Sequence, residues 1–226
     1  MMNKNFWIIL FLIVLAIDLF AAYSGNETLR YFSKPLLMPL LIVYFIFNTN
    51  TVASLKKWIV LALVFSWLGD VLLMFEARNN IFFIFGLVAF LIAHIFYILF
   101  YENILKLENL KKNYWLFIPV LIYYVALIYL LSPHLGEMKL PVRVYGVVIS
   151  YMLIQAFQVA RIKNRAASAM MITGAILFIA SDSILAMNKF YQPFELAGIA
   201  IMITYGMAQL LITLGATRYI NSISKE

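Results

Sequence analysis

The chain is a succession of apolar runs, most of them about as long as a membrane-spanning helix, separated by short polar segments. A spanning helix needs about 20 mostly apolar residues, because the hydrocarbon core of a bilayer is about 30 Å thick. We predict eight such helices, over residues 6–23, 35–47, 58–75, 81–101, 115–131, 142–160, 168–187 and 196–217. Only 12% of the 226 residues are charged, against about 25% in a soluble domain. The sequence therefore predicts an all-α, polytopic membrane protein, with residues 1–226 as one transmembrane domain.

The first apolar run also has features of a secretory signal peptide, since a lysine precedes it and small residues end it. Asp18 interrupts the apolar core of this run, which continues to Tyr23. We therefore expect an uncleaved first helix.

The positions of lysine and arginine predict the orientation of the helices, because cytoplasmic loops are enriched in these residues. Eleven of the 17, including Lys4 and Lys225, lie at the termini and the even-numbered connections, and six lie at the odd-numbered ones. We expect both termini in the cytoplasm. The net charge of +7 comes from these short loops, where cations set topology and meet lipid headgroups, so we expect no nucleic-acid partner.

Two of the apolar runs each contain one aspartate and no cation to neutralise it: SWLGDVLLMF contains Asp70, and GAILFIASDSILAM contains Asp182. An ionisable group in hydrocarbon costs at least a few kcal/mol, so such residues usually mark a functional site. In both runs the order is a small residue, Asp, two residues and Leu. Each aspartate precedes a glycine by 16 residues, and 112 residues separate the two sets. This spacing predicts a 4+4 internal repeat with a site between its halves.

Other polar residues lie within or at the ends of the predicted helices. His94 and Tyr97 are three residues apart and Tyr205 and Gln209 are four apart, so each pair shares a helix face. Further residues lie near the outer helix ends, namely Lys34 and Tyr145. Together these residues permit a polar chamber that opens toward the outer headgroup layer.

Each of these residues also has a purely structural interpretation. A buried Asp, His or Gln can satisfy an interhelical hydrogen bond, and Ser181 can be a small packing residue. Five glycines are expected at close-packing positions, namely Gly86, Gly146, Gly174, Gly198 and Gly206. We expect Asp18 to be solvated near the interface or to pair with Lys34.

Several hydrolytic chemistries lack the residues they need. The chain has no cysteine, so it has no thiol nucleophile and no thiolate metal site. It contains no G-x-S-x-G and no H-E-x-x-H sequence, and its two histidines, His94 and His134, are too few for a three-histidine zinc site. Carboxylates remain the candidates for catalysis, with His94 and tyrosines in support.

An ordered set of short motifs resembles the YhhN-like family of membrane lysoplasmalogenases. The motifs are Lys34-Pro35, Gly69-Asp70 with Leu73, Gly86 with Phe90, His94 with Tyr97, Pro141 with Tyr145, Gly174-Ala175 with Phe178, Ser181-Asp182, Lys189-Phe190, and Tyr205 with Ala208-Gln209. The resemblance implies an eight-helix hydrolase that cleaves the vinyl-ether bond of a lysoplasmalogen, releasing a fatty aldehyde and a glycerophospho-alcohol. It implies a lysophospholipid substrate within the lipid of a membrane, for which we expect a bacterial inner membrane.

A vinyl ether is cleaved by protonation of its β-carbon, which gives an oxocarbenium ion that water attacks. This chemistry resembles that of glycosidases and needs one protonated carboxylic acid and one anion. We hypothesise that Asp70 and Asp182 form this pair, in either order, with His94 and Tyr205 orienting them or the water. No metal or organic cofactor is required. The predicted substrate-binding residues are Lys34 and Lys189, which would hold the phosphate, with Tyr97, Tyr145, Ser181 and Gln209.

Two other function classes use the same residues. Intramembrane Asp and His residues also form proton relays, and a 4+4 repeat suits alternating access, so a proton-coupled transporter of small solutes is one alternative. A lipid-binding protein without turnover is the other. A chemical product separates the hydrolase from both.

Overall fold

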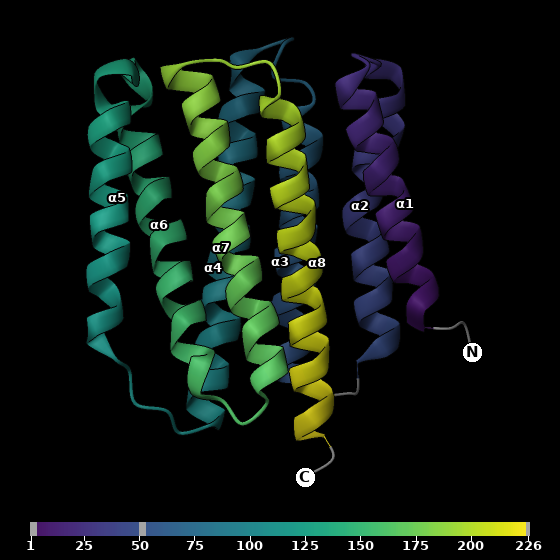
Figure 1. The fold of residues 1–226 in the computed structure, drawn as a ribbon, viewed down its shortest axis with the longest axis vertical. Helices are drawn as coiled ribbons and strands as arrows, with labels where there is room; N and C mark the ends of the chain where they lie inside the picture. The colour runs from purple at the N-terminus through teal and green to yellow at the C-terminus, as the bar shows by residue number, and fades with distance from the viewer. Residues whose placement is uncertain (1–3, 50–52, 225–226) are drawn as a thin grey trace.

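The computed structural model describes residues 4–49 and 53–224 as a bundle of eight α-helices (Figure 1). They are α1 (Lys4–Tyr23), α2 (Glu27–Asn48), α3 (Ala53–Leu73), α4 (Asn80–Leu107), α5 (Phe117–Leu131), α6 (Lys139–Gln158), α7 (Arg165–Ala186) and α8 (Ala197–Ile223). No β-strand occurs in this part of the chain, so the predicted all-α class is confirmed. Lys225, which entered the charge count, lies outside the described residues.

Seven of the eight described helices are long and apolar enough to cross a membrane, and α3 is the exception. Every stretch of 18 residues within α3 contains all three of its charged residues, Lys56, Lys57 and Asp70. α3 nevertheless runs alongside the other helices (Figure 1). The connections alternate between the two ends of the bundle, and both termini lie at the same end. The multi-pass membrane architecture is confirmed, and the count of eight spans stays a prediction.

The second helix departs most from its prediction. It was expected to begin at Pro35, but α2 begins at Glu27, capped by the side chain of Asn26, and contains both Pro35 and Pro39. A proline has no N–H, so it leaves the carbonyl four residues earlier without a helical donor. For Pro39 that carbonyl belongs to Pro35, and the indole N–H of Trp67 in α3 donates to it at 2.9 Å. A neighbouring helix thus replaces the hydrogen bond that the proline removes.

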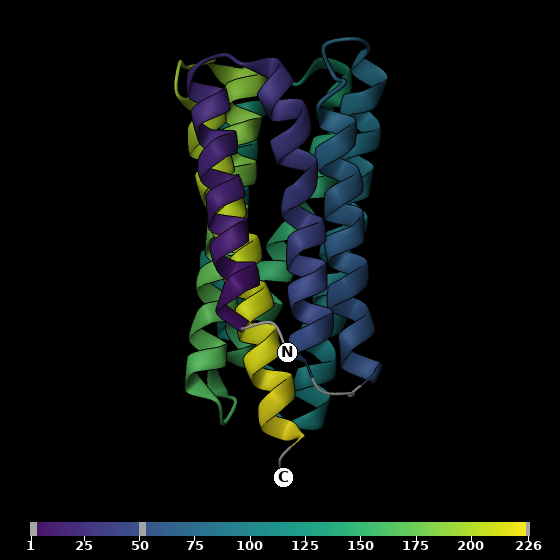
Figure 2. The same cartoon turned by 90° about the vertical axis from the view of Figure 1, so that its right-hand side faces the viewer.

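Seven helices close a ring in the order α1, α2, α3, α4, α6, α7, α8, and α5 packs on the outside of α6. α8 also contacts α2 and α3, which places its side chains toward the middle of the bundle. Figure 2 shows α1 lying against α8 on one side of the bundle. α7 and α8 approach closely at Gly174, where the absence of a side chain leaves room for α8. A Cβ at this position would come within 2.9 Å of the carbonyl oxygen of Ala208. This contact confirms the close-packing prediction for Gly174.

The predicted 4+4 repeat stays a prediction. It would make α3 equivalent to α7 and α4 equivalent to α8, and the pairs α3–α4 and α7–α8 do pack side by side. The first helices of the two halves are placed differently, because α1 lies in the ring and α5 lies outside it.

Candidate active site

A cavity of about 390 Å³ opens at the end of the bundle that lies away from the two termini. Asp70 of α3 and Asp182 of α7 both line it. Gly198 lines it too, and no atom stands within 4 Å of where its Cβ would be, so the close-packing expectation for Gly198 is wrong. The remaining polar lining is Glu27, Arg30, Tyr31, Lys34, Glu76, Ser181, Asn188 and Tyr205. The chain therefore has the polar chamber that the sequence permits, and it holds both predicted carboxyl groups.

Asp70 is almost completely buried, with 2% of its surface exposed. Its Oδ2 accepts a hydrogen bond of 2.7 Å from the hydroxyl of Tyr205 in α8, and its Oδ1 lies 3.9 Å from Nζ of Lys34 in α2. The side chain of Lys34 is itself only 11% exposed. In a site with so little water, an ammonium group and a phenol hydroxyl together stabilise a negative charge on the carboxyl of Asp70.

Asp18 contradicts its prediction. It is fully buried in α1, and its Oδ1 accepts a hydrogen bond of 2.8 Å from Oγ of Ser33. It is therefore not solvated, and the ion pair that Lys34 makes is with Asp70. The reason is position on the helix, because Ser33 and Lys34 are adjacent residues that point to different sides of α2. Asp18 is also not part of the cavity lining.

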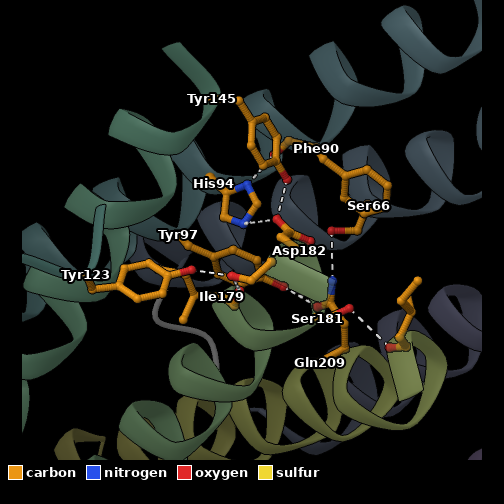
Figure 3. Close-up of polar contacts among 12 residues, drawn as sticks. Ser66, Phe90, His94, Tyr97, Tyr123, Tyr145, Ile179, Ser181, Asp182 and Gln209 are labelled. Atoms are coloured by element: carbon orange, nitrogen blue, oxygen red, sulfur yellow. Dashed lines mark hydrogen bonds and ion pairs between the residues drawn. The ribbon is translucent and has the colours of Figure 1, made fainter. Parts of the chain in front are cut away.

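Asp182 has a different set of partners (Figure 3). The hydroxyl of Tyr145 in α6 donates to Oδ2 of Asp182 at 2.5 Å, and Nε2 of His94 lies 3.9 Å from the same oxygen. Nδ1 of His94 lies 2.7 Å from the carbonyl oxygen of Phe90. A carbonyl oxygen can only accept, so Nδ1 carries the hydrogen, and Nε2 of the neutral ring presents a lone pair toward Asp182. When the imidazole of His94 is protonated and the carboxyl of Asp182 is ionised, the two side chains attract each other.

Two aromatic rings, those of Phe178 and Phe90, pack against the polar rings of the site. Phe178 is fully buried and meets the rings of His94 and Tyr205 edge-to-face, with centroids 4.6 Å and 5.5 Å away. Phe90 meets Tyr205 in the same way at 5.8 Å. These contacts fix the orientation of both polar rings. Their roles at the site escaped the sequence analysis, although Phe90 and Phe178 lie four residues before His94 and Asp182 and so share a helix face with them.

Tyr97 and Gln209 lie in a buried network beside the cavity (Figure 3). Tyr97 donates its hydroxyl to Oε1 of Gln209 at 2.5 Å, and Nε2 of Gln209 donates to Oγ of Ser66 at 2.9 Å. The network ties α4, α8 and α3 together. Of the two predicted helix-face pairs, His94 with Tyr97 and Tyr205 with Gln209, only Tyr205 lines the cavity. His94 is linked to the cavity through Asp182. Ser66 was not predicted, although it lies one helical turn before Asp70.

The predicted phosphate-binding lysines are both engaged in ion pairs. Lys34 pairs with Asp70, and Lys189 lies at the rim, where its Nζ is 3.5 Å from Oε2 of Glu76. Arg30 lines the cavity, and its Nε is buried without a hydrogen-bond partner among the described residues. Arg30 is one of the six cations at the odd-numbered connections and was not predicted to bind substrate, yet it lies four residues before Lys34 and shares its helix face. Arg30 is therefore the better-placed anion ligand.

The remaining predicted residue, Ser181, both packs and lines the site. Its Oγ donates to the carbonyl oxygen of Ile201 in α8 at 3.1 Å, and the residue forms part of the cavity wall. Across residues 4–49 and 53–224, no three His, Asp or Glu side chains gather closely enough to hold a metal ion. The cavity thus presents two carboxyl groups in different surroundings, one beside an ammonium group and one beside an imidazole, and such a pair can divide acid and base roles.

Comparison with known proteins places this site in a family. The YhhN family profile matches residues 29–216, a range that holds both aspartates and all the partners named for them. Lysoplasmalogenase TMEM86B of Rattus norvegicus is 33% identical over 159 residues, which cover 70% of this chain and 60% of that protein. Lysoplasmalogenase TMEM86B of Homo sapiens is 34% identical over 158 residues, covering 70% and 62%. A lysoplasmalogenase of Mycobacterium bovis is 31% identical over 166 residues, covering 71% and 60%.

The chain thus spans about three-fifths of the length of the curated relatives it matches. No solved structure matches it. Because the family profile covers most of the chain, including both aspartates and their partners, this protein belongs to the YhhN family.

Proposed function

We propose that this protein hydrolyses the vinyl-ether bond of lysoplasmalogens, releasing a fatty aldehyde and a glycerophospho-alcohol. The observation that carries the proposal is the meeting of Asp70 and Asp182 in one cavity inside a membrane bundle, each with its own partners. Curated relatives in the same family are named lysoplasmalogenases, which supports this substrate over others that a carboxylate pair can cleave.

The reaction begins when one carboxylic acid gives its proton to the β-carbon of the vinyl ether. The electrons of the double bond form the new C–H bond, which leaves an oxocarbenium ion at the carbon bonded to oxygen. The other carboxylate stabilises this cation and accepts a proton from the water that attacks it. The resulting hemiacetal loses its hydroxyl proton as the bond to the glycerol oxygen breaks, and that oxygen takes up a proton. One water is consumed, and both carboxyl groups return to their starting states.

The described contacts suggest how the other residues serve this chemistry. Tyr205 and Tyr145 donate hydrogen bonds to Asp70 and Asp182 and so hold the two carboxyl groups in place. His94, whose Nε2 lies 3.9 Å from Oδ2 of Asp182, is placed to orient Asp182 or the attacking water. Nearer the mouth, Arg30 is placed to bind the substrate phosphate, with Lys34 contributing charge to both the phosphate and Asp70.

The orientation in the membrane follows from the charge count and is part of the proposal. With both termini in the cytoplasm of a bacterial inner membrane, the cavity opens to the opposite, outer leaflet. The chain has no cysteine, so single cysteines report accessibility cleanly. A membrane-impermeant maleimide should label Glu137→Cys in intact cells and should label Lys111→Cys only after lysis. The reverse pattern would show that the cavity opens to the cytoplasm.

The test of function is product analysis with purified protein and three lysophospholipids that differ only in a 1-alkenyl, 1-alkyl or 1-acyl chain. Aldehyde from the alkenyl lipid alone supports the proposal. Fatty acid from the acyl lipid would instead indicate a lysophospholipase. The absence of product from all three would favour the transporter or the lipid-binding protein. In ¹⁸O-labelled water, the glycerophospho-alcohol should carry no label, because water attacks the alkenyl carbon.

A further inference from the structure

An apolar crevice between α4, α6 and α7 joins the polar cavity. Four residues line both spaces, namely Leu73, Phe90, Asp182 and Leu185. Beyond these four, Tyr145 brings the only polar side-chain group among the residues that line the crevice, and its hydroxyl is bonded to Asp182. The crevice therefore offers a ligand no free hydrogen-bonding side chain beyond Asp182. Water is a poor occupant of such a space, and a hydrocarbon is a good one.

The crevice is closed toward the end of the bundle where the cavity opens. The rings of Phe83 and Phe190 meet edge-to-face there, with centroids 5.9 Å apart, and Nζ of Lys189 lies 4.9 Å from the centroid of Phe83. Lys189 and Phe190 belong to a wide π-type turn, Met187–Tyr191, that continues α7, and Phe190 is part of the crevice lining. Such turns are frequent at functional sites. A lipid headgroup therefore reaches the membrane surface through the cavity and not through the crevice.

The side of the crevice faces the lipid. Leu87 of α4 lines it and is half-buried, and Ile84, which is three residues earlier and shares the same helix face, is 39% exposed. In a membrane bundle, apolar side chains exposed to this degree contact hydrocarbon. The crevice therefore lies between the polar cavity and the acyl region of the bilayer.

We propose that the crevice holds the hydrocarbon chain of the lipid whose polar part occupies the cavity, and that this chain reaches the bilayer between α4 and α6. The occupant is an unbranched alkenyl chain, because the crevice is narrow and apolar and is continuous with the polar chamber. The proposal rests on the proposed function and deepens it. The bond that is cleaved joins the polar part to the chain, so it lies where the two spaces meet.

This placement distinguishes the two carboxyl groups. Asp182 lies in both spaces and is therefore the acid beside the reacting double bond. Asp70 lines only the polar cavity, beside Lys34, and is the anion that stabilises the cation and takes the proton from water. Asp182→Asn should therefore abolish the step that puts a solvent proton on the β-carbon.

A bulky residue in the crevice tests the proposal. Leu87→Trp fills the crevice, and Val88→Trp, on the next residue of the same helix, adds the same side chain on the lipid side. With 1-alkenyl lysophospholipids of long and of short chain, Leu87→Trp should lower kcat/KM for the long chain about tenfold or more relative to the short one. Val88→Trp should leave this ratio unchanged. An unchanged ratio in folded Leu87→Trp would overturn the proposal.

A binding experiment tests the proposal if Leu87→Trp loses activity toward both the long-chain and the short-chain substrate. A 1-alkyl lysophospholipid with a diazirine in the first few carbons of its chain is added to the wild-type protein in detergent micelles, irradiated, and mapped by mass spectrometry. Adducts on α4 residues 83–90, none of which lines the crevice beside α5, support the proposal. Adducts on α5, which borders a second crevice that shares only Asp182 with the cavity, would overturn it. Because this ligand is not hydrolysed, the outcome does not depend on the proposed activity.

Discussion

The substitution Tyr205→Phe removes one hydroxyl and tests whether its hydrogen bond to Asp70 stabilises the negative charge of that carboxyl group. Tyr205 donates a hydrogen bond of 2.7 Å to Oδ2 of Asp70, whose surface is 2% exposed. A hydrogen bond to a charged group contributes about 1.5–3 kcal/mol, and little water is present to replace it. If Asp70 is the catalytic anion, kcat/KM for the alkenyl substrate should fall about 10- to 150-fold, since about 1.4 kcal/mol corresponds to tenfold. Part of the loss can appear instead as a lower melting temperature.

The assay couples aldehyde release to reduction by alcohol dehydrogenase and follows NADH, beside thermal unfolding in detergent. Tyr101→Phe is the matched control, because the hydroxyl of Tyr101 is buried without a hydrogen-bond partner among the described residues. Its removal should leave the rate unchanged and the melting temperature unchanged or higher. If Tyr205→Phe behaves like Tyr101→Phe in both measurements, the hydrogen bond to Asp70 does not support catalysis and the reasoning is refuted.

Two further substitutions test packing and charge. Gly174→Ala places a Cβ about 2.9 Å from the carbonyl oxygen of Ala208, so it should cost about 1–3 kcal/mol and lower the melting temperature, whereas Gly198→Ala meets no atom within 4 Å and should not. Equal melting temperatures would contradict the close approach of α7 and α8. Lys34→Met removes the cation beside Asp70 and should cost about 3–5 kcal/mol of combined stability and activity, which Lys34→Arg should largely restore. A Lys34→Met variant as stable and active as wild type would show that the ion pair is not important.

Sequence patterns predicted the features that depend on composition and local spacing. The apolar runs predicted the helices because a membrane admits few other structures, and the two aspartates stood out because ionisable groups are costly in hydrocarbon. Both Asp70 and Asp182 line the cavity, as expected of a shared site. The predicted start of the second helix was wrong because proline was expected to end a helix. That expectation does not allow for a hydrogen-bond donor from a neighbouring helix, here the indole N–H of Trp67.

The partners of each polar group were harder to predict, because they depend on which helices become neighbours. Lys34 was expected near Asp18 or a phosphate, but the packing of α2 against α3 brings it to Asp70. Tyr97 and Gln209 share helix faces with His94 and Tyr205, yet they bond to each other across the α4–α8 interface. Helix periodicity gives the face of a residue and not its partner, so the crevice between α4, α6 and α7 was not visible in the sequence.

The central claim is that two carboxyl groups inside the membrane cleave a vinyl ether. The most direct measurement is mass spectrometry of the products formed from a 1-alkenyl lysophospholipid by wild-type protein, Asp70→Asn, Asp182→Asn and Asp18→Asn, each checked for folding by size exclusion. Asp18 is the control, since it is a buried carboxyl outside the cavity lining. We predict that aldehyde release falls at least about 100-fold in Asp70→Asn and Asp182→Asn and persists in Asp18→Asn. Wild-type aldehyde release by folded Asp70→Asn or Asp182→Asn would contradict the account.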